Sequence, residues 1–249
     1  MEEIDQIREG EEGNYREARK VLGESVSLVE DLLNLYKLIG QMTKESGVEP
    51  RDEIVCSLTF LLACHYQLTI GSLTLLRGHL TDSFFFLRKA IELCAFAVRV
   101  KRHPHLAMEW LCAGSNEASY ESYCKKFSGS KIFPDDHPLL KQLQERYDDC
   151  SKQSHGSVYA LARHCQPEED KKEFRISFNY FELKNNDLSE PIRTLLYVID
   201  THFGILRVFE NVLSDVISHD QKKWEIQMNY VDAKIGVQKS KWKKVVLPT

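Results

Sequence analysis

Two charged side chains stand in the most apolar stretch of this sequence, where they could do chemistry. Arg88 and Glu92 lie four residues apart within "RGHLTDSFFFLRKAIELCAF", so on a helix they meet on one face, and Arg99 continues the same strip two turns after Glu92. A buried charge is costly unless it finds a partner. The pair is therefore either a structural ion pair that fixes the register of the helix or the charged wall of a pocket.

A second group of polar side chains occurs in "YDDCSKQSHGSVY". Tyr147, Ser151, His155 and Tyr159 follow one another at steps of four residues, and they line one face if the helix continues through Gly156. A histidine titrates near neutral pH, so His155 could act as a general acid or base, although a hydrogen-bonded structural role fits it equally well. A serine hydrolase is disfavoured, because the segment around Ser151 lacks a nucleophile elbow and an identifiable third member.

The remaining histidine and cysteine residues indicate no metal site and no cofactor site. His103 and His105 in "RHPH" could hold a metal only with further ligands that the sequence does not supply, so a solvated helix start is the better interpretation. Seven cysteines, an odd number without a CxxC pair, are expected to be reduced thiols in apolar surroundings. The sequence has no phosphate-binding glycine loop and no HExxH motif. We therefore expect neither a metal site nor a cofactor.

Composition describes an ordinary globular chain. With 249 residues, 43% of them apolar, it is long enough to bury a substantial core. Thirty-three basic side chains against 37 acidic ones leave a formal charge of -4, so no overall field recruits nucleic acid or an anionic membrane, and any such binding must be local. The charged start "MEEIDQIREGEEGNYREARK" lacks the apolar core of a signal peptide, and we expect a cytoplasmic protein.

Three segments with helical spacing of apolar residues precede the second polar group: 14–41, 54–76 and roughly 82–101. Gly78 marks a turn between the second and third segments. We therefore predict an all-α helical bundle with a long central antiparallel helix pair.

The segment 54–76 also raises the possibility of a membrane span. It contains no Asp, Glu, Lys or Arg, and it is long enough to cross a bilayer. Against a span, His65, Tyr66 and Gln67 cluster at its centre, and no aromatic belt or one-sided basic flank frames it. We favour a central helix of a soluble bundle over a membrane span.

The rest of the chain continues the helical pattern with one interruption. A fourth helix follows Pro104, a kinked helix or two helices flank Gly156, and a closing helix starts at Ser189. Segment 173–183, "EFRISFNYFEL", is predicted to be one short strand or extended strip. The expected organisation is a charged N-terminal extension at 1–13, the bundle domain at 14–218, and a basic C-terminal tail at 219–249 with seven lysines against three acids. Such a tail is more commonly solvated than bound to RNA, a membrane surface or a partner chain.

Taken together, "LLRGHLTDSFFFLRKAIELCAF" and the later "YDDCSKQSHGS" resemble uncharacterised bacterial helical proteins that are similar to the HEPN superfamily, which includes toxin and phage-defence ribonucleases. The resemblance covers about residues 50–215. Its LRxxxE pattern falls on Leu87, Arg88 and Glu92, and its YxxxSxxxH segment falls on Tyr147, Ser151 and His155. The resemblance implies an all-α, HEPN-like bundle.

One departure from the HEPN ribonuclease pattern bears on activity. Those nucleases resemble one another through an arginine separated from a later histidine by four to six intervening residues, and here the matching positions before His155 hold Asp148, Asp149 and Cys150. Arg146 lies further upstream, on the opposite side of a continuous helix. The resemblance therefore implies the fold more strongly than it implies nuclease chemistry.

Two functional hypotheses remain, and each predicts a different geometry. In the first, the chain is an intracellular bacterial defence or stress-response protein that acts on or binds RNA or a nucleotide. The residues that it would use are His155 as acid or base, Arg88 on phosphate charge, Glu92 orienting Arg88, and Tyr147, Ser151, Tyr159 and Arg99 in substrate binding. It predicts an open polar pocket, with His155 near the Arg88–Glu92 pair. In the second, the chain is a non-catalytic interaction module that forms a homodimer and binds a protein partner, and it predicts a closed, internally satisfied polar cluster.

Overall fold

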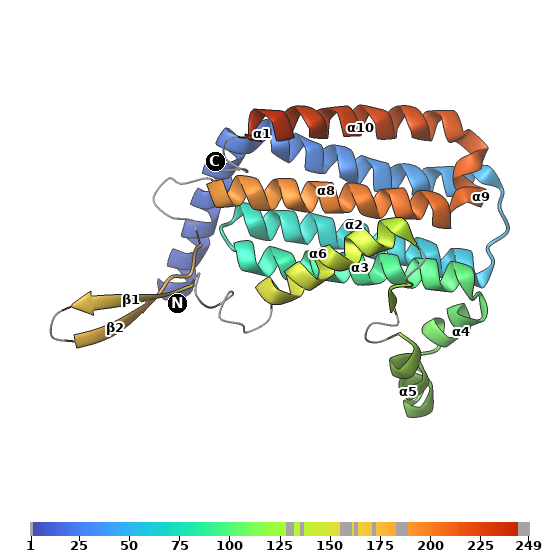
Figure 1. The fold of residues 1–249 in the computed structure, drawn as a ribbon, viewed down its shortest axis with the longest axis horizontal. Helices are drawn as coiled ribbons and strands as arrows, with labels where there is room; N and C mark the ends of the chain where they lie inside the picture. Colours follow the sequence, from blue (N-terminus) through green and yellow to red (C-terminus); the bar gives the residue numbers. More distant parts are fainter. Residues whose placement is uncertain are drawn as a thin grey trace.

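The computed structural model describes residues 2–127, 132–134, 137–154, 161, 164–170, 173–182 and 189–243, with only the backbone path described for residues 2 and 165–178. The fold is all-α, as the sequence predicts (Figure 1). Long helices carry the core. The principal ones are α1 (Glu2–Ser46), α2 (Asp52–Leu76), α3 (Leu80–Arg102), α6 (Pro138–Ser154), α8 (Ser189–Val212) and α10 (Gln221–Lys241).

The helices α2 and α3 pack side by side along their lengths and are joined by a tight turn. Gly78 in this turn has a φ of 102°, a conformation that L side chains rarely adopt, so glycine is required there. The two helices also approach each other closely at Gly71 of α2, because a Cβ added there would lie 3.1 Å from the Cβ of Phe86 on α3. The other long helices run alongside this pair: α1 packs against α2 and α8, α8 packs against α2 and α3, and α6 packs against α3 and α8.

The helix α2 passes the length and hydropathy test for a membrane span, yet 44% of its most apolar window is buried inside the bundle. Its inward face carries Phe60, Leu61, Cys64 and Leu68, none of them more than 1% exposed. These contacts make α2 a core helix of the bundle. On its outward face, Leu62 and Tyr66 remain exposed in the described part of the structure.

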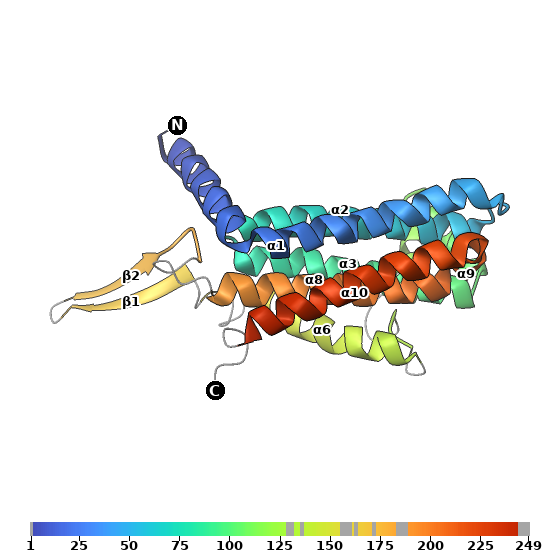
Figure 2. The same ribbon diagram turned by 90° about the horizontal axis from the view of Figure 1, so that it is seen from above.

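The two ends of the chain depart from the expected organisation. Of the charged extension expected at 1–13, residues 2–13 belong to α1, which begins at Glu2. The first turns of α1 lean away from the bundle (Figure 2). Most of the expected basic tail forms α10, which packs on α1 and α8 with Trp224 fully buried. The prediction of a solvated tail was wrong there because it gave more weight to the lysines than to the helical spacing of the apolar residues. Those residues are Trp224, Met228, Val231 and Ile235.

Shorter elements join the long helices. The segment after Pro104 forms two helices instead of the single one expected, α4 (His105–Leu111) and α5 (Glu117–Lys126), because the turn before Asn116 interrupts it. Asn116 then caps α5 by accepting a hydrogen bond from the backbone N–H of Ser119. Between α8 and α10 lie α9 (Ser214–Ile217) and a 3-10 turn (Ser218–Asp220).

The strand expected near 173–183 is present as β2 (Glu173–Phe178), but it is not isolated. It pairs antiparallel with β1 (Cys165–Asp170), with Cys165 opposite Phe178 and Asp170 opposite Glu173. The hairpin projects from the end of the bundle where α1 leans outward (Figures 1 and 2). Residues 165–170 carry no alternating pattern of apolar and polar side chains, so the partner strand was not predicted.

Candidate polar site on α6

Arg88, Glu92 and Tyr147 form one compact cluster where α3 meets α6. Arg88 Nη2 donates a hydrogen bond of 2.8 Å to the Tyr147 hydroxyl, which in turn donates one of 3.0 Å to Glu92 Oε1. Arg88 Nη2 and Glu92 Oε1 lie 3.3 Å apart as an i,i+4 ion pair, and the guanidinium also stacks on the Tyr147 ring at 4.9 Å. Each member therefore contacts the other two.

The cluster is partly shielded from water, with the Arg88 and Glu92 side chains 22% and 20% exposed. Burial, and to a smaller degree the nearby Glu92 carboxylate, raises the pKa of Tyr147, although its hydrogen bond from Arg88 opposes the shift. Tyr147 is thus a protonated phenol at neutral pH. As such it can accept from the arginine and donate to the carboxylate at the same time, which links the two charges.

A second arginine–tyrosine–carboxylate cluster ties the other side of α6 to α8. Arg146 forms an ion pair with Asp200, donates a 2.7 Å hydrogen bond to Thr201 Oγ1, and stacks on the Tyr197 ring at 5.1 Å. Burial alone would raise the pKa of Asp200, but hydrogen bonds from Lys239 of α10 and from Arg146 outweigh it and lower that pKa. The adjacent residues Arg146 and Tyr147 therefore fix α6 to two different helices.

The remaining predicted site residues do not all join the first cluster. The Ser151 hydroxyl donates to the carbonyl of Tyr147 at 2.8 Å, within its own helix. Arg99 lies eleven residues beyond Arg88, about 16 Å along α3, and stacks over Phe127 at 5.9 Å. His155 and Tyr159 lie outside the described residues, since the description of α6 ends at Ser154. The expected contact between His155 and the Arg88–Glu92 pair therefore stays a prediction.

Within the described part of the chain, no group of three or more His, Cys, Asp or Glu side chains is arranged to hold a metal ion. The rings of His103 and His105 lie 6.0 Å apart near the start of α4. Six of the cysteines are described as free thiols, namely Cys56, Cys64, Cys94, Cys112, Cys124 and Cys150. Burial raises the pKa of Cys150 to about 12, so this thiol beside the second cluster is a poor nucleophile.

Two buried polar contacts escaped the sequence analysis. Tyr36 of α1 and His202 of α8 are hydrogen-bonded at 2.9 Å between the hydroxyl and Nδ1, and both are at most 2% exposed. Glu182, after the hairpin, accepts from the backbone N–H and the hydroxyl of Thr81 at 2.6 and 2.7 Å, and so caps α3. A lone histidine in the apolar stripe of α8 was a usable signal for the first contact. The second joins residues 101 positions apart and had no local signal.

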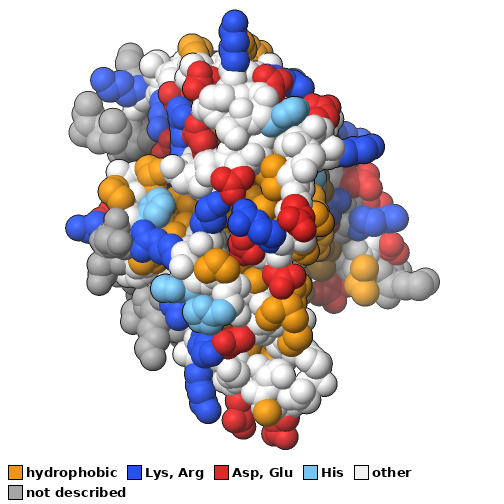
Figure 3. All heavy atoms as spheres, turned by 90° about the vertical axis from the view of Figure 1, so that its right-hand side faces the viewer, with side chains coloured by type: hydrophobic (Ala, Val, Ile, Leu, Met, Phe, Trp, Pro, Cys, Tyr) orange, Lys and Arg blue, Asp and Glu red, His pale blue; other side chains and the backbone are white. Residues whose placement is uncertain are grey.

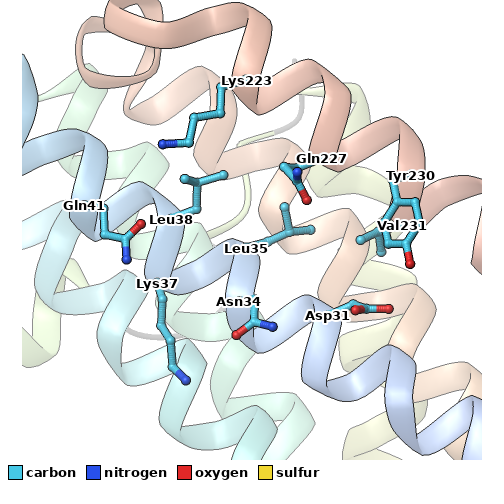
Figure 4. Close-up of a pocket in the computed structure, with 10 residues that line it drawn as sticks. All are labelled: Asp31, Asn34, Leu35, Lys37, Leu38, Gln41, Lys223, Gln227, Tyr230 and Val231. Carbon is cyan, nitrogen blue, oxygen red and sulfur yellow. The ribbon is translucent and has the colours of Figure 1, made fainter.

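The seam between α1 and α10 contains a groove of about 340 Å³ (Figure 4). Leu35, Leu38 and Val231 line it together with polar side chains that include Lys37 and Lys223. These lysines point in different directions, one toward the seam and one away from it (Figure 4). The polar ends do not converge on one point, so the groove lacks the arrangement that orients a small ligand.

Charges on the end of the bundle near α4 and α9 are mixed in sign (Figure 3). Arg51 and Lys101 both pair with Asp215, at 3.2 and 3.3 Å. Acidic and basic side chains thus neutralise one another on this face. Such a surface does not attract a phosphate backbone in the way that a basic patch does.

Comparisons with protein-family models, with curated proteins and with solved structures find no match to this chain. The site is therefore interpreted from its own geometry.

Proposed function

We propose that this chain is a non-catalytic helical interaction module, acting inside the cell, that dimerises and binds a protein partner. In this proposal Arg88, Glu92 and Tyr147 form an internal polar strut. The observation that carries it is the closed pattern of hydrogen bonds, in which the phenol accepts from the arginine and donates to the glutamate. A catalytic arginine is instead expected to keep its donors directed at a substrate.

The strut has a physical role of its own. Arg88 and Glu92 are themselves only 22% and 20% exposed, so removing one charge leaves the other poorly solvated and without its partner. Placing one phenol between two charges also fixes the position of α6 along α3, because the hydrogen bonds have narrow distance and angle limits. The cluster therefore specifies register, which an apolar contact of the same size would specify less well.

A second candidate function is a HEPN-like protein of bacterial defence or stress response that acts on or binds RNA or a nucleotide. One observation favours it: the two segments that carry the resemblance lie against each other, with Arg88 and Glu92 contacting Tyr147. In this proposal His155 supplies the acid or base and Arg88 turns to phosphate. The absence of an arginine at positions 148–150, which are separated from His155 by four to six residues, weighs against nuclease chemistry, so binding is the better-supported form of this candidate.

Expression of the wild type beside Arg88→Ala, Tyr147→Phe and His155→Ala separates the two candidates. RNA integrity, growth and melting temperature are measured for each, with Lys89→Ala as a control because Lys89 is an exposed neighbour on α3. The interaction-module proposal expects intact RNA and normal growth throughout. It also expects Arg88→Ala and Tyr147→Phe to be less stable than the control by about 1–2 kcal/mol, since each breaks partly buried hydrogen bonds.

The opposite result would favour the effector. If the wild type degrades RNA or stops growth, and His155→Ala and Arg88→Ala abolish this while melting normally, then the cluster is functional and the interaction-module proposal is wrong.

A further inference from the structure

The outward face of α2 carries a row of side chains that the described part of the bundle leaves exposed in its first four members and covers in part in its last two. Its members recur at steps of four and three residues, the spacing of a coiled-coil seam. We call this row the α2 stripe; it consists of Val55, Thr59, Leu62, Tyr66, Thr69 and Leu73. Leu62 and Tyr66, at its centre, are 64% and 56% exposed. Large apolar side chains exposed in a row mark an interaction surface.

We propose that the α2 stripe is the homodimer interface of this protein, where α2 packs antiparallel against α2 of a second copy. The inference rests on the proposed interaction role and names the surface that dimerisation uses. It concerns a face of α2 that is separate from the Arg88, Glu92 and Tyr147 cluster, which α3 and α6 form between them.

The absence of charge favours a second copy as the occupant. In a two-fold interface both copies present the same surface, so a charge near the axis lies close to an identical charge on the second copy and is repelled by it. The sequence from Ile54 to Leu76 contains no Asp, Glu, Lys or Arg. An acidic or basic partner would find no complementary charge on this face, whereas an identical uncharged face matches it.

The two threonines of the stripe are compatible with a dry seam. The hydroxyl of Thr59 donates to the carbonyl of Val55 at 2.9 Å, and that of Thr69 donates to the carbonyl of His65 at 3.0 Å. Each threonine therefore has a partner for its donor within α2. Burying them against another helix leaves no hydroxyl hydrogen without an acceptor.

The spacing also suits an antiparallel pair. A two-fold axis passing level with residue 64 places Leu62 opposite Tyr66 of the second copy. It likewise places Val55 opposite Leu73 and Thr59 opposite Thr69. In this one register each apolar position faces an apolar position and each threonine faces a threonine.

The available area agrees with a weak dimer. A helix of 25 residues is about 37 Å long and 10 Å wide. The strip on α2 therefore covers ~370 Å², about half of the ~800 Å² that each partner contributes to a standard interface. Dimers are accordingly expected toward the upper end of a concentration series.

The first test measures the molar mass of the wild type by light scattering and sedimentation over a nanomolar to hundred-micromolar dilution series. We expect twice the chain mass of 28.9 kDa at the upper end. Leu62→Glu should shift the protein to a monomer with an unchanged helical spectrum and melting profile. Tyr230→Glu is the matched control, because Tyr230 is an equally exposed apolar residue, 54% exposed, on α10.

A second test reads the geometry directly. In a protein with Cys112, Cys124 and Cys165 changed to Ser, the single variants Leu62→Cys and Tyr66→Cys are mixed and treated with a short bismaleimide. The antiparallel pairing predicts that position 62 cross-links to position 66 more readily than to position 62. Preferential cross-linking of 62 to 62 would indicate a parallel pair and overturn the proposal.

Three other outcomes also overturn it: a wild type that stays monomeric throughout, a dimer that survives Leu62→Glu, or an α2-dependent binding to phosphatidylcholine–phosphatidylglycerol vesicles by a monomer. These failures differ from a failure of the proposed function. A failure of the proposed function is detected by RNA degradation or growth arrest that depends on His155. That result is independent of whether the protein is a monomer or a dimer.

Discussion

At the scale of single residues, burial decides which polar groups can do chemistry. His202 is 1% exposed and hydrogen-bonded to Tyr36, and burial lowers its pKa to about 3. It therefore stays neutral in the folded protein across the physiological range. Tyr147 is shifted in the other direction and stays protonated for the same reason. Both residues serve as hydrogen-bonding elements of the interior.

The neutral state of His202 makes stability depend on pH. An unfolded histidine has a pKa of about 6.5 and takes up a proton below that pH, whereas His202 in the folded state does not until about pH 3. The unfolded state therefore binds more protons in this window, and stability falls as the pH falls. We expect His202 to cost roughly 2 kcal/mol of unfolding free energy between pH 6.5 and pH 5.

Urea denaturation at several pH values measures this effect in the wild type, in His202→Gln and in His219→Gln. His219 is exposed and serves as the matched control. His202→Gln should flatten the pH dependence while His219→Gln should not. An identical slope in the wild type and His202→Gln would contradict the neutral, buried state of this histidine.

At the scale of elements, the junctions of the helices depend on residues that are distant in sequence. Glu182 caps α3 through Thr81, and its own N–H donates to the carbonyl of Gly78 at 3.0 Å. The ring of Phe181 packs so closely on α1 that a Cβ added to Gly10 would lie 2.7 Å from it. The segment after the hairpin thus joins α1 to the turn between α2 and α3.

Loss of the Glu182 cap should destabilise this junction. The carboxylate lies at the N-terminal end of α3, where it accepts a hydrogen bond from a backbone N–H. Its negative charge is stabilised there by the positive end of the helix dipole. We expect Glu182→Ala to lower the unfolding free energy by about 1–2 kcal/mol in chemical denaturation. Glu121→Ala is the control, because Glu121 belongs to an exposed ion pair with Lys125 on α5. Equal stability of the two variants would show that the cap contributes nothing.

Periodicity predicted the helical elements well and predicted their partners poorly. The helical periodicity of apolar residues in α2 and α8 is clear enough to be recognised without a structure. The pairing of Arg88 with Glu92 at i,i+4 could be recognised in the same way. Tyr147 as the third member of that cluster required the packing of α6 on α3, which no local pattern encodes. The role of α10 was hidden because it carries apolar side chains on two opposite faces, with Trp224 inward and Tyr230 outward. That pattern weakens the contrast from which an amphipathic helix is recognised.

At the scale of the whole molecule, the bundle is closed by the last helix in the chain. Lys234 and Lys241 of α10 form ion pairs with Asp31 and Glu24 of α1. Lys239 reaches Asp200 of α8, the same carboxylate that holds Arg146 of α6. Much of the basic charge near the C-terminus is thus used internally, which leaves less of it available for a nucleic acid.

Removing α10 should therefore unfold the protein, whereas removing only the residues after it should not. A buried tryptophan removes about 150–250 Å² from water, so Trp224 alone contributes ~5 kcal/mol, an amount comparable to the whole stability of a typical domain. We expect a chain ending at Asp220 to lose cooperative thermal unfolding and to bind a hydrophobic dye. A chain ending at Lys243 keeps every buried side chain of α10 and should melt like the full-length protein. A folded, cooperative Asp220 truncation would mean that residues 221–249 are the dispensable tail that their lysines suggest, and that α1 and α8 are stable without a cover.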